Sequence, residues 1–474
     1  MAAGLSHAGR RLEPTRVAVV VAVAAAVALG AAAGLTHQPL LVVGALGGLA
    51  YLLLAITTPL VAVVCFFLLV FLSQLSVLGP GVTAAKGAGA ALVLGWIYRE
   101  ISGRGDGSAF RTNRTFVLLA APFLMWCIAS ALWASDPGTV VSSTARIAQG
   151  PLLVVALVGL TRDERAVQIL CTTFVAGATL SAVVGLSGVT HADTSAVGDS
   201  RLTGGIGDPN YLAAVLVPAI ALALFTSFGA RRGLSRVLVA IGGLLCLVAL
   251  FLTQSRGGIV ALAVTLFLAV ALGGRARRKV VTVVTVVIAL ASIYLVLVAP
   301  PHALGRLTQF TSGGGTGRTD LWKVALQAFR AHPIQGIGLG NFIVVEPTFA
   351  VTFNSDLPRA DLVVTERQPV HNTYLHIAAE LGAVGIVLFV ALLWSVLAAT
   401  RRGVRAATAA GDYPLELAGR GLLVGTIGML AAFTFLTAQY EKQLWLTLGL
   451  ALAFARVATA RPDDRAEPAA LPRR

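Results

Sequence analysis

A histidine followed by a polar helical face stands near the end of the longest polar stretch of the chain, in His371-Asn372-Thr373-Tyr374-Leu375-His376. Counted from Asn372, the side chains of His376 and Glu380 follow at i+4 and i+8, so the three share one face of a helix. A neutral imidazole accepts a proton near neutral pH, so His371 is suited to act as a general base toward a hydroxyl group. The alternative is a histidine that only forms structural hydrogen bonds.

His376 and Glu380 also have the i, i+4 spacing of two metal ligands on a helix. A catalytic zinc usually takes three protein ligands, and the sequence has no HExxH pattern. We therefore expect chemistry without a metal or any other cofactor, with a metal at this pair as the alternative.

Two arginines lie in segments suited to hold an anion. Arg201 precedes a glycine-rich stretch that ends in Asp208-Pro209-Asn210, and Arg256 lies in a very short polar turn between apolar runs. Glycines let the backbone approach a ligand closely, and a guanidinium binds phosphate oxygens through a fork of N–H donors. The alternatives are an ordinary loop residue and a turn residue that reaches the membrane surface. Arg146, within an apolar run, is more typical of a structural contact.

The composition determines where these side chains work. Of the 474 residues, 57% are hydrophobic and 12% are charged, and the mean hydropathy is +0.84. Soluble chains carry about 25% charged residues. Runs such as 115–134 and 280–298 reach or approach the roughly 20 residues that cross a bilayer. The chain is therefore an all-α polytopic membrane protein, and a soluble enzyme, a secreted disulfide scaffold, a coiled coil and a disordered chain are excluded.

The net charge of +15 does not indicate nucleic-acid binding. The arginines recur in short clusters between apolar runs, as in the cytoplasmic loops of membrane proteins, and no basic and aromatic patch lies in a soluble domain. The four cysteines fall within apolar runs, so we interpret them as small buried side chains rather than a disulfide set or a metal site.

We expect 12 to 14 membrane-spanning helices from the lengths of the apolar runs. The first run has the basic start and alanine-rich end of a signal peptide, and an uncleaved helix is favoured because no separate soluble domain follows it. The predicted spans are residues 17–35, 40–56, 59–76, 84–98, 115–134, 140–160, 166–187, 209–228, 237–253, 257–272, 280–299, 373–399, 418–437 and 443–457.

The arginine clusters predict the orientation. If the N-terminus is cytoplasmic, the clusters at 10–16, 99–114, 162–165, 231–236, 275–279 and 401–405 all lie on the inner side, as the positive-inside rule requires. Both termini are then cytoplasmic, in a multi-pass protein of the plasma (inner) membrane.

Two segments of the predicted outer side, residues 188–208 and 300–370, are unusually polar, and the second is longer than ordinary connections. Within it, residues 312–317 are predicted to be a glycine-rich hinge. Residues 319–330 are predicted to form an amphipathic helix on the outer membrane surface, capped by Thr319. Its polar face carries Asp320, Lys323, Gln327 and Arg330.

The chain divides into three predicted parts. Residues 1–187 form N-terminal transmembrane helices, and residues 188–457 form a membrane region that carries the polar outer segments, including the loop 300–370. Residues 458–474 form a cytoplasmic tail whose mixed charges are typical of disorder.

Four motifs in chain order resemble those of the O-antigen ligase and polymerase superfamily. The resemblance covers residues 201–385, and one departure is His376, where the family often has glutamine. The motifs are Arg201 with Gly207-Asp208-Pro209-Asn210-Tyr211, Ser255-Arg256-Gly257-Gly258, Gly317-Arg318-x-x-x-Trp322 with Pro333-Ile334-Gln335-Gly336, and His371-Asn372-x-x-Leu375 with Glu380, Gly382 and Gly385.

The resemblance implies a membrane glycosyltransferase of the cell envelope that takes part in polysaccharide biosynthesis. Such a protein transfers a glycan from a polyprenyl-diphosphate carrier to a glycan, lipid or protein hydroxyl, with inversion and without a metal. A diphosphate is already a good leaving group, so two cations and one base suffice. Arg201 and Arg256 would hold the diphosphate and His371 would be the base. Arg318, Asn372, His376 and Glu380 would support them.

Two other functions remain as alternatives. A small-solute or anion transporter of the same superfamily would show paired broken helices near the middle of the membrane. A purely structural membrane protein gives no reason for a base beside two arginines. The collection of polar residues on the outer side favours the transferase. Ligase or polymerase activity, the sugar, the acceptor, the number of spans and the oligomeric state are not determined by the sequence.

Overall fold

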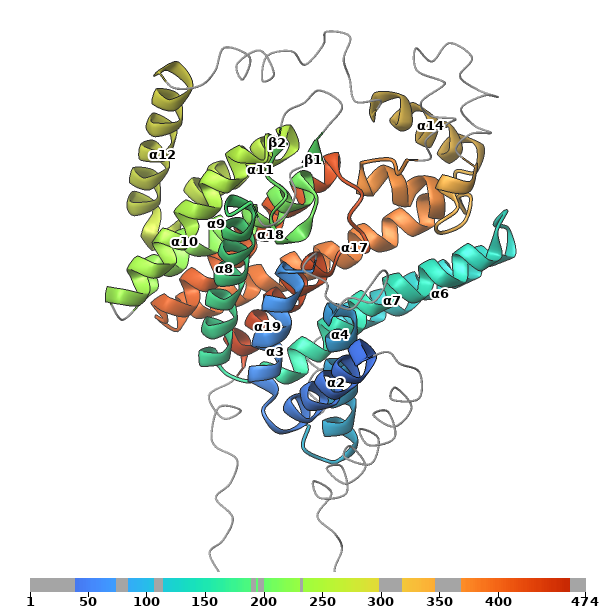
Figure 1. The fold of residues 1–474 in the computed structure, drawn as a ribbon, viewed down its shortest axis with the longest axis horizontal. Coiled ribbons are helices and arrows are strands. Elements are labelled where there is room, and N and C mark those ends of the chain that lie inside the picture. Colours follow the sequence, from blue (N-terminus) through green and yellow to red (C-terminus); the bar gives the residue numbers. More distant parts are fainter. Residues whose placement is uncertain are drawn as a thin grey trace, which may run out of the picture.

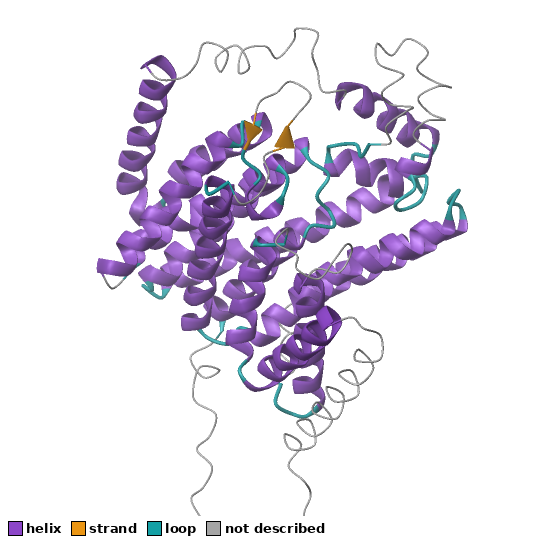
Figure 2. Cartoon of the chain, in the orientation of Figure 1, coloured by secondary structure: helices purple, strands orange, loops and turns teal. Residues whose placement is uncertain are grey.

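The computed structural model describes residues 39–73, 84–105, 114–188, 193–194, 200–230, 233–297, 318–345 and 368–460. Helices make up most of these residues (Figure 2), which confirms the predicted all-α membrane fold. Strands β1 (Asp193–Thr194) and β2 (Ser200–Arg201) form a small antiparallel pair. The predicted span 17–35, the hinge 312–317 and residues 461–474 of the predicted tail lie outside the described residues.

The helices follow the predicted spans closely (Figure 1). They are α2 (Pro39–Thr57), α3 (Pro59–Phe71), α4 (Ala84–Ile101), α6 (Arg114–Ala129), α7 (Pro137–Leu160), α8 (Glu164–Leu186), α9 (Pro209–Gly229), α10 (Gly233–Leu252), α11 (Arg256–Ala271), α12 (Arg277–Leu297), α14 (Arg318–Ala331), α17 (Thr373–Ala409), α18 (Tyr413–Ala432) and α19 (Lys442–Thr459), with the short 3-10 turns η1 (Ser130–Leu132), η2 (Gly204–Ile206), η3 (Gly274–Ala276) and η4 (Phe433–Phe435).

Among the described residues, seven helices are long and apolar enough to cross a membrane, or up to eight if the bent pair α11–α12 is one span. The expected 12 to 14 spans also count shorter or more polar helices such as α2, α3, α4 and α19, so that number stays a prediction.

Short polar side chains start many of these helices. Each accepts hydrogen bonds from backbone N–H groups of the first turn, which have no partner within the helix. In several cases a proline follows, because its fixed φ and missing N–H suit the first helical position. The capping residues are Asp136, Asp163, Asp208, Ser255, Asn372 and Asp412.

Helices α9 and α18 form the centre of the bundle, and 78% of the residues in the most apolar stretch of each are buried. In the most apolar stretch of the span that contains α6, only 28% of the residues are buried. Since all three sequences are apolar, the peripheral one presents its side chains to lipid, and Leu118 and Met125 are examples of such exposed residues.

Helix α17 is broken at Gly382, whose φ of 67° lies outside the helical range. The break frees backbone groups, and a loop after α14 binds them. Ile337 N donates to Ala379 O at 3.1 Å, Gly338 N to Glu380 O at 2.8 Å, and Ala383 N donates to Pro333 O at 2.8 Å. The loop therefore fills the break and ties α14 to α17.

Glycine is required where this loop meets the break. A Cβ atom on Gly382 would lie 2.1 Å from the carbonyl oxygen of Ile334, and one on Gly336 would lie 2.3 Å from that of Glu380. Both residues also have positive φ, at 67° and 71°. A side chain at either position would separate the loop from the helix.

The amphipathic helix predicted at 319–330 is found as α14, one residue longer at each end. The predicted cap is wrong, because Thr319 lies inside the helix. Asp320, predicted on the polar face, is buried at 7% exposure among Leu321 and Val324. It pairs with Lys323 at 3.3 Å, which offsets part of the cost of burying its charge.

The predicted inner segments lie together at one end of the bundle. Arg162 donates to the carbonyl of Arg104 at 2.7 Å, and Arg275 donates to that of Thr408 at 3.1 Å. Segments far apart in the chain thus share the basic end, as the alternation of arginine clusters requires. Which side of the membrane this end faces stays a prediction.

Candidate active site

Arg201 lies on strand β2 and is held against the turn between α10 and α11. Its Nε donates to the carbonyl of Thr253 at 3.0 Å, and its Nη2 donates to Oδ1 of Asn210 at 3.2 Å. The backbone N–H of Leu202 donates to the carbonyl of Leu252 at 3.2 Å. Two segments separated by about fifty residues are therefore joined at Arg201.

Asn210 joins the two arginine-bearing segments. Its Oδ1 accepts from Arg201 and also from the hydroxyl of Ser255 at 2.9 Å. Asp208 starts the same helix, α9, and accepts from the backbone N–H groups of Asn210 and Tyr211. The Asp-Pro-Asn sequence thus has a structural role, because Asn210 holds Arg201 close to the start of α11.

Arg256 is the first residue of α11, and its side chain is exposed. Ser255 caps the helix by accepting from the N–H of Gly258 at 3.3 Å. Gln254 before it has a φ of 51°, which is rare for a residue with a side chain. The tight turn aims Arg256 away from the helix core.

Arg318, the first residue of α14, interacts electrostatically with both of these arginines. Burial lowers its pKa below the ordinary value, repulsion from Arg201 adds to this effect, and Arg256 adds less. Asp208 opposes the shift. Arg318 was assigned a supporting role from the sequence, and the structure brings it into the same cationic group as Arg201 and Arg256.

His371 immediately precedes the cap of α17. Its φ is 55°, and the Asn372 side chain behind it accepts from the N–H of Leu375 at 3.0 Å. Burial lowers the pKa of His371 to about 4, and repulsion from Arg318 and His376 contributes. Burial contributes more to this shift than the two charged neighbours do. The imidazole is therefore neutral at neutral pH.

Backbone strain concentrates at these residues. Gln254 and His371 are the non-glycine residues with positive φ in the described part of the chain. Such conformations cost roughly 1–3 kcal/mol each and cluster at functional sites. Gln254 lies two residues before Arg256, and His371 is itself a predicted site residue. The strain therefore supports a functional role for this end of the bundle.

His376 and Glu380 are buried and bonded to each other, with Nε2 of His376 at 3.0 Å from Oε1 of Glu380. Thr437 contacts Nδ1 of His376 at 3.4 Å, and the N–H of Phe342 donates to Oε1 of Glu380 at 3.2 Å. The pair therefore fastens α17 to neighbouring segments. Within the described residues, no group of three potential ligands gathers around it as a metal site would require.

The connection between α18 and α19 also lines this region, which was not predicted from the sequence. The hydroxyl of Thr373 donates to Leu436 O at 2.6 Å, and the hydroxyl of Tyr211 donates to Thr437 O. Glu441 ends the connection. Burial raises its pKa, Lys442 and Arg146 oppose this effect, and Asp208 adds a smaller upward contribution. The available signal was the charged pair Glu441 and Lys442 between two apolar runs.

Arg146 has the structural partner expected from the sequence. Its guanidinium lies over the ring of Tyr440, 4.6 Å from the ring centre. A cation over an aromatic face is a stabilising contact, strongest where water is excluded. Tyr440 belongs to the α18–α19 connection, so Arg146 fastens α7 to the wall of the site.

Comparison with known families agrees with the motifs. A family model described as O-Antigen ligase matches residues 241–390, which confirms the predicted resemblance. The matched range includes Arg256, Arg318 and the segment from His371 to Glu380, whereas Arg201 lies outside it. No curated protein matches the chain. The match supports a multi-pass membrane protein that acts as a glycan ligase or polymerase.

Proposed function

We propose that this chain, a member of the O-antigen ligase superfamily over residues 241–390, transfers a glycan from a polyprenyl-diphosphate carrier to an acceptor hydroxyl. The acceptor is a glycan, a lipid or a protein. The reaction takes place on the outer face of the plasma membrane, with both termini of the chain in the cytoplasm.

One observation carries the proposal: a neutral, half-buried histidine lies beside Arg318, which in turn interacts with Arg201 and Arg256. Arg318 influences the pKa of His371, and Arg201 and Arg256 influence that of Arg318. These residues come from four separate segments of the chain. A diphosphate beside a base is the arrangement that transfer from a carrier requires.

The proposed reaction is a direct displacement. The acceptor oxygen attacks the anomeric carbon of the donor sugar, and its proton passes to the free ring nitrogen of His371. The bond between that carbon and the diphosphate oxygen breaks on the opposite side, so the configuration inverts. The polyprenyl diphosphate leaves with the electron pair, and the arginines stabilise its charge.

The arginines and the histidine are expected to act in sequence. Without donor, burial and Arg318 keep the pKa of His371 low. A bound diphosphate adds negative charge close to Arg318, and a nearby opposite charge favours the protonated imidazole. Donor binding therefore makes His371 a stronger base when it is needed.

The proposed step requires no cofactor, because the leaving group carries its own activation and the arginines supply the positive charge. His376 and Glu380 position the start of α17, since each is bonded to segments outside that helix. Asn372 caps the same helix and presents His371.

Transfer by the purified protein in liposomes tests the proposal. The assay contains carrier-linked glycan and an acceptor, without nucleotide sugar and with a chelator present. Transfer that requires the carrier diphosphate supports the proposal. Failure with every carrier-linked donor, together with donor-independent solute uptake into the liposomes, would contradict it.

Two bent segments resemble the broken helices expected of a transporter. They are the break in α17 at Gly382 and the 96° bend between α11 and α12. In transporters, the freed backbone groups at such breaks bind the solute or ion. Here the freed groups at Ala379, Glu380 and Ala383 are bonded to the loop after α14. The bend between α11 and α12 lies at the basic end of the bundle, where Arg420 donates to the carbonyl of Leu272. Both observations favour the transferase.

A further inference from the structure

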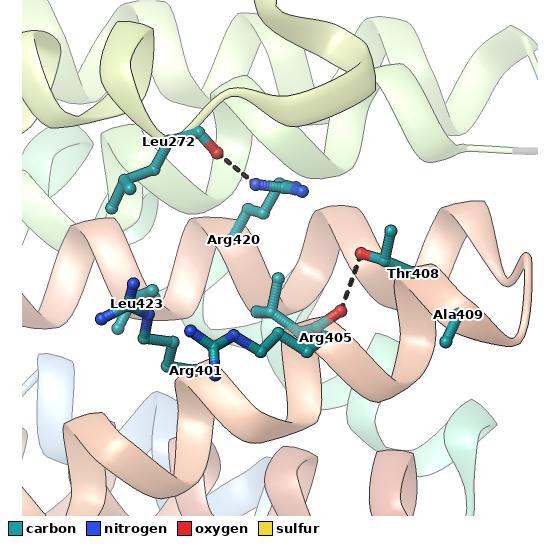
Figure 3. A pocket seen from close by; sticks show the side chains of 8 residues that line it. Leu272, Arg401, Arg405, Thr408, Ala409, Arg420 and Leu423 are labelled. Carbon is teal, nitrogen blue, oxygen red and sulfur yellow. Dashed lines mark hydrogen bonds between the residues drawn. The ribbon is translucent and has the colours of Figure 1, made fainter.

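A cavity of about 390 Å³ lies at the end of the bundle opposite to His371, between α17 and α18 (Figure 3). Its apolar wall includes Leu272, Val404 and Leu423, and Arg401, Arg405 and Arg420 supply its charge. Arg401 follows the break at Gly382 by about 28 Å of helix. The cavity is therefore separate from the candidate active site.

One of these three arginines is already neutralised. Glu416 is fully buried, and its carboxylate is 2.9 Å from Nη2 of Arg420 and 2.8 Å from Nη2 of Arg275. Arg420 also donates to the carbonyl of Leu272, which closes one side of the cavity. This arrangement is a structural clamp between α18 and the bend after α11.

The other two arginines are differently placed. Arg401 and Arg405 are exposed and lie one helical turn apart, with both guanidinium groups extending into the same space (Figure 3). Among the described residues, no carboxylate lies within ion-pair distance of either. Like charges at this spacing repel each other along a helix. An anion between them would remove that repulsion.

We propose that this cavity binds the phosphate group of an anionic membrane lipid. A guanidinium fork suits phosphate oxygens, and two forks one turn apart can hold one phosphate from both sides. Val404 and Leu423 provide an apolar wall for the glycerol and the first methylene groups, which a free phosphate would leave unused. Basic pockets between helices at the cytoplasmic surface are suited to such headgroups.

Lipid retention by the full-length protein tests this site. The protein is purified in mild detergent, mixed with phosphatidylglycerol or phosphatidylcholine, and examined by native mass spectrometry and thermal unfolding. Inorganic phosphate forms a third arm that distinguishes a free anion from a lipid headgroup. We expect retention of phosphatidylglycerol with at least tenfold preference over phosphatidylcholine and no stabilisation by millimolar phosphate.

Three variants separate the site from the general effect of positive charge. Arg401→Gln with Arg405→Gln should lose the preference for phosphatidylglycerol. The same two residues changed to Lys keep the charge that orients the protein, and should weaken retention several-fold because the fork is lost. Arg402→Gln removes an exposed arginine of the same helix that does not line the cavity, and should retain lipid as the unmodified protein does.

Each result has a defined meaning. Equal retention of phosphatidylglycerol by the Gln variant and by the Arg402→Gln control would overturn the proposal. So would stabilisation by phosphate alone, which would indicate a soluble anion. If the Gln variant fails to fold, the Lys variant decides, and unchanged retention by that variant would also contradict the proposed fork. Glycan transfer is not a readout here, so failure of the proposed function would leave this test intact.

Discussion

The two ends of the bundle hold arginines in different ways. At the His371 end, Arg201 donates to a carbonyl and to the side-chain oxygen of Asn210, which are neutral acceptors. At the opposite end, Arg275 and Arg420 pair with the buried carboxylate of Glu416. A neutral acceptor orients a guanidinium without cancelling its charge, whereas a carboxylate cancels it. Arg275 and Arg420 therefore fix the fold, whereas anion binding is our proposal for Arg201.

The two ends of the bundle also differ in their backbone φ angles. Gln254 and His371 have strained φ angles at the His371 end. At the opposite end the positive φ values, at Gly103, Gly274 and Gly411, belong to glycines that adopt them without strain. Among the described residues, the strained non-glycine backbone thus lies at the His371 end.

The comparison assumes that the two ends face opposite sides of the membrane. A topology reporter fused after Ala350 should read as external, and one fused after Arg405 as cytoplasmic, with an all-or-none difference in signal. The reason is the alternation of arginine clusters along the chain. Opposite signals at the two fusions would reverse the orientation and place the candidate active site in the cytoplasm.

The largest effect on activity is expected for His371→Ala. Loss of a general base typically costs about 10²–10⁴-fold in rate. Binding of the carrier-linked donor should persist, because the arginines remain. The measurement is transfer in liposomes together with donor binding.

Two matched variants complete this test. His332→Ala changes an exposed histidine at the end of α14 and should transfer normally. His376→Ala should be milder than His371→Ala, since His376 positions the helix. Substantial turnover by His371→Ala would contradict the assignment of His371 as the general base and would favour the transporter alternative.

Glu416→Gln tests the clamp at the opposite end. Breaking a buried ion pair costs about 3–5 kcal/mol, and we expect the lower end because the Arg275 side chain is 46% exposed. The measurement is thermal or denaturant unfolding in detergent. Glu164→Gln, at a half-buried position at the start of α8, is the control and should change stability little. A stable Glu416→Gln protein would show that the two arginines do not depend on the carboxylate.

A smaller effect is expected for Arg256→Lys and Arg318→Lys. Lysine keeps the charge but loses the fork, so donor affinity should fall about tenfold, equivalent to about 1.4 kcal/mol. Arg330→Lys, on the exposed face of α14, provides the control. Full donor affinity in the Arg256 variant would leave Arg256 as a residue that only anchors the helix end.

The smallest effect concerns pH. Because the pKa of His371 is lowered to about 4, the base is neutral and active above that value, and kcat/KM should stay flat from about pH 8 down to about pH 5. The fall in kcat should occur at higher pH than the fall in kcat/KM, since bound diphosphate raises the pKa of His371. The pH profiles of kcat and of kcat/KM test this prediction. Inflections at the same pH would contradict the coupling to the donor.

Helix positions were predictable because their signals are local. Residues 209–228 were predicted and Pro209–Gly229 are helical, since an Asp-Pro cap precedes an apolar run. The prediction for α17 was too short. Hydropathy ends at Arg401, but the helix continues to Ala409, because most of the residues beyond the apolar run are arginine and alanine, which are good helix formers.

The candidate site was only partly predictable. His371, Arg256 and Arg201 were found from their residue types and surroundings. The grouping of Arg318 with the other two arginines and the position of Glu441 beside the site were not predicted. Each depends on segments that approach it from elsewhere in the chain. Asp320 lies on the same face as Lys323, as predicted, but its burial was not predicted, since helical periodicity does not show how much of a helix its neighbours cover.

The sequence by itself determined the membrane class, the starts of most helices and the end of the bundle to which each arginine belongs. These properties follow from the length of apolar runs, from capping side chains and from the distribution of charge, all of which act over a few residues. Only the tertiary structure decided which arginines pair with a buried carboxylate and that Arg318 acts on His371. Glu416 meets Arg275, and Asn210 meets Ser255, across long separations in the chain. Such contacts exist only when packed helices bring those segments together, so no local pattern encodes them.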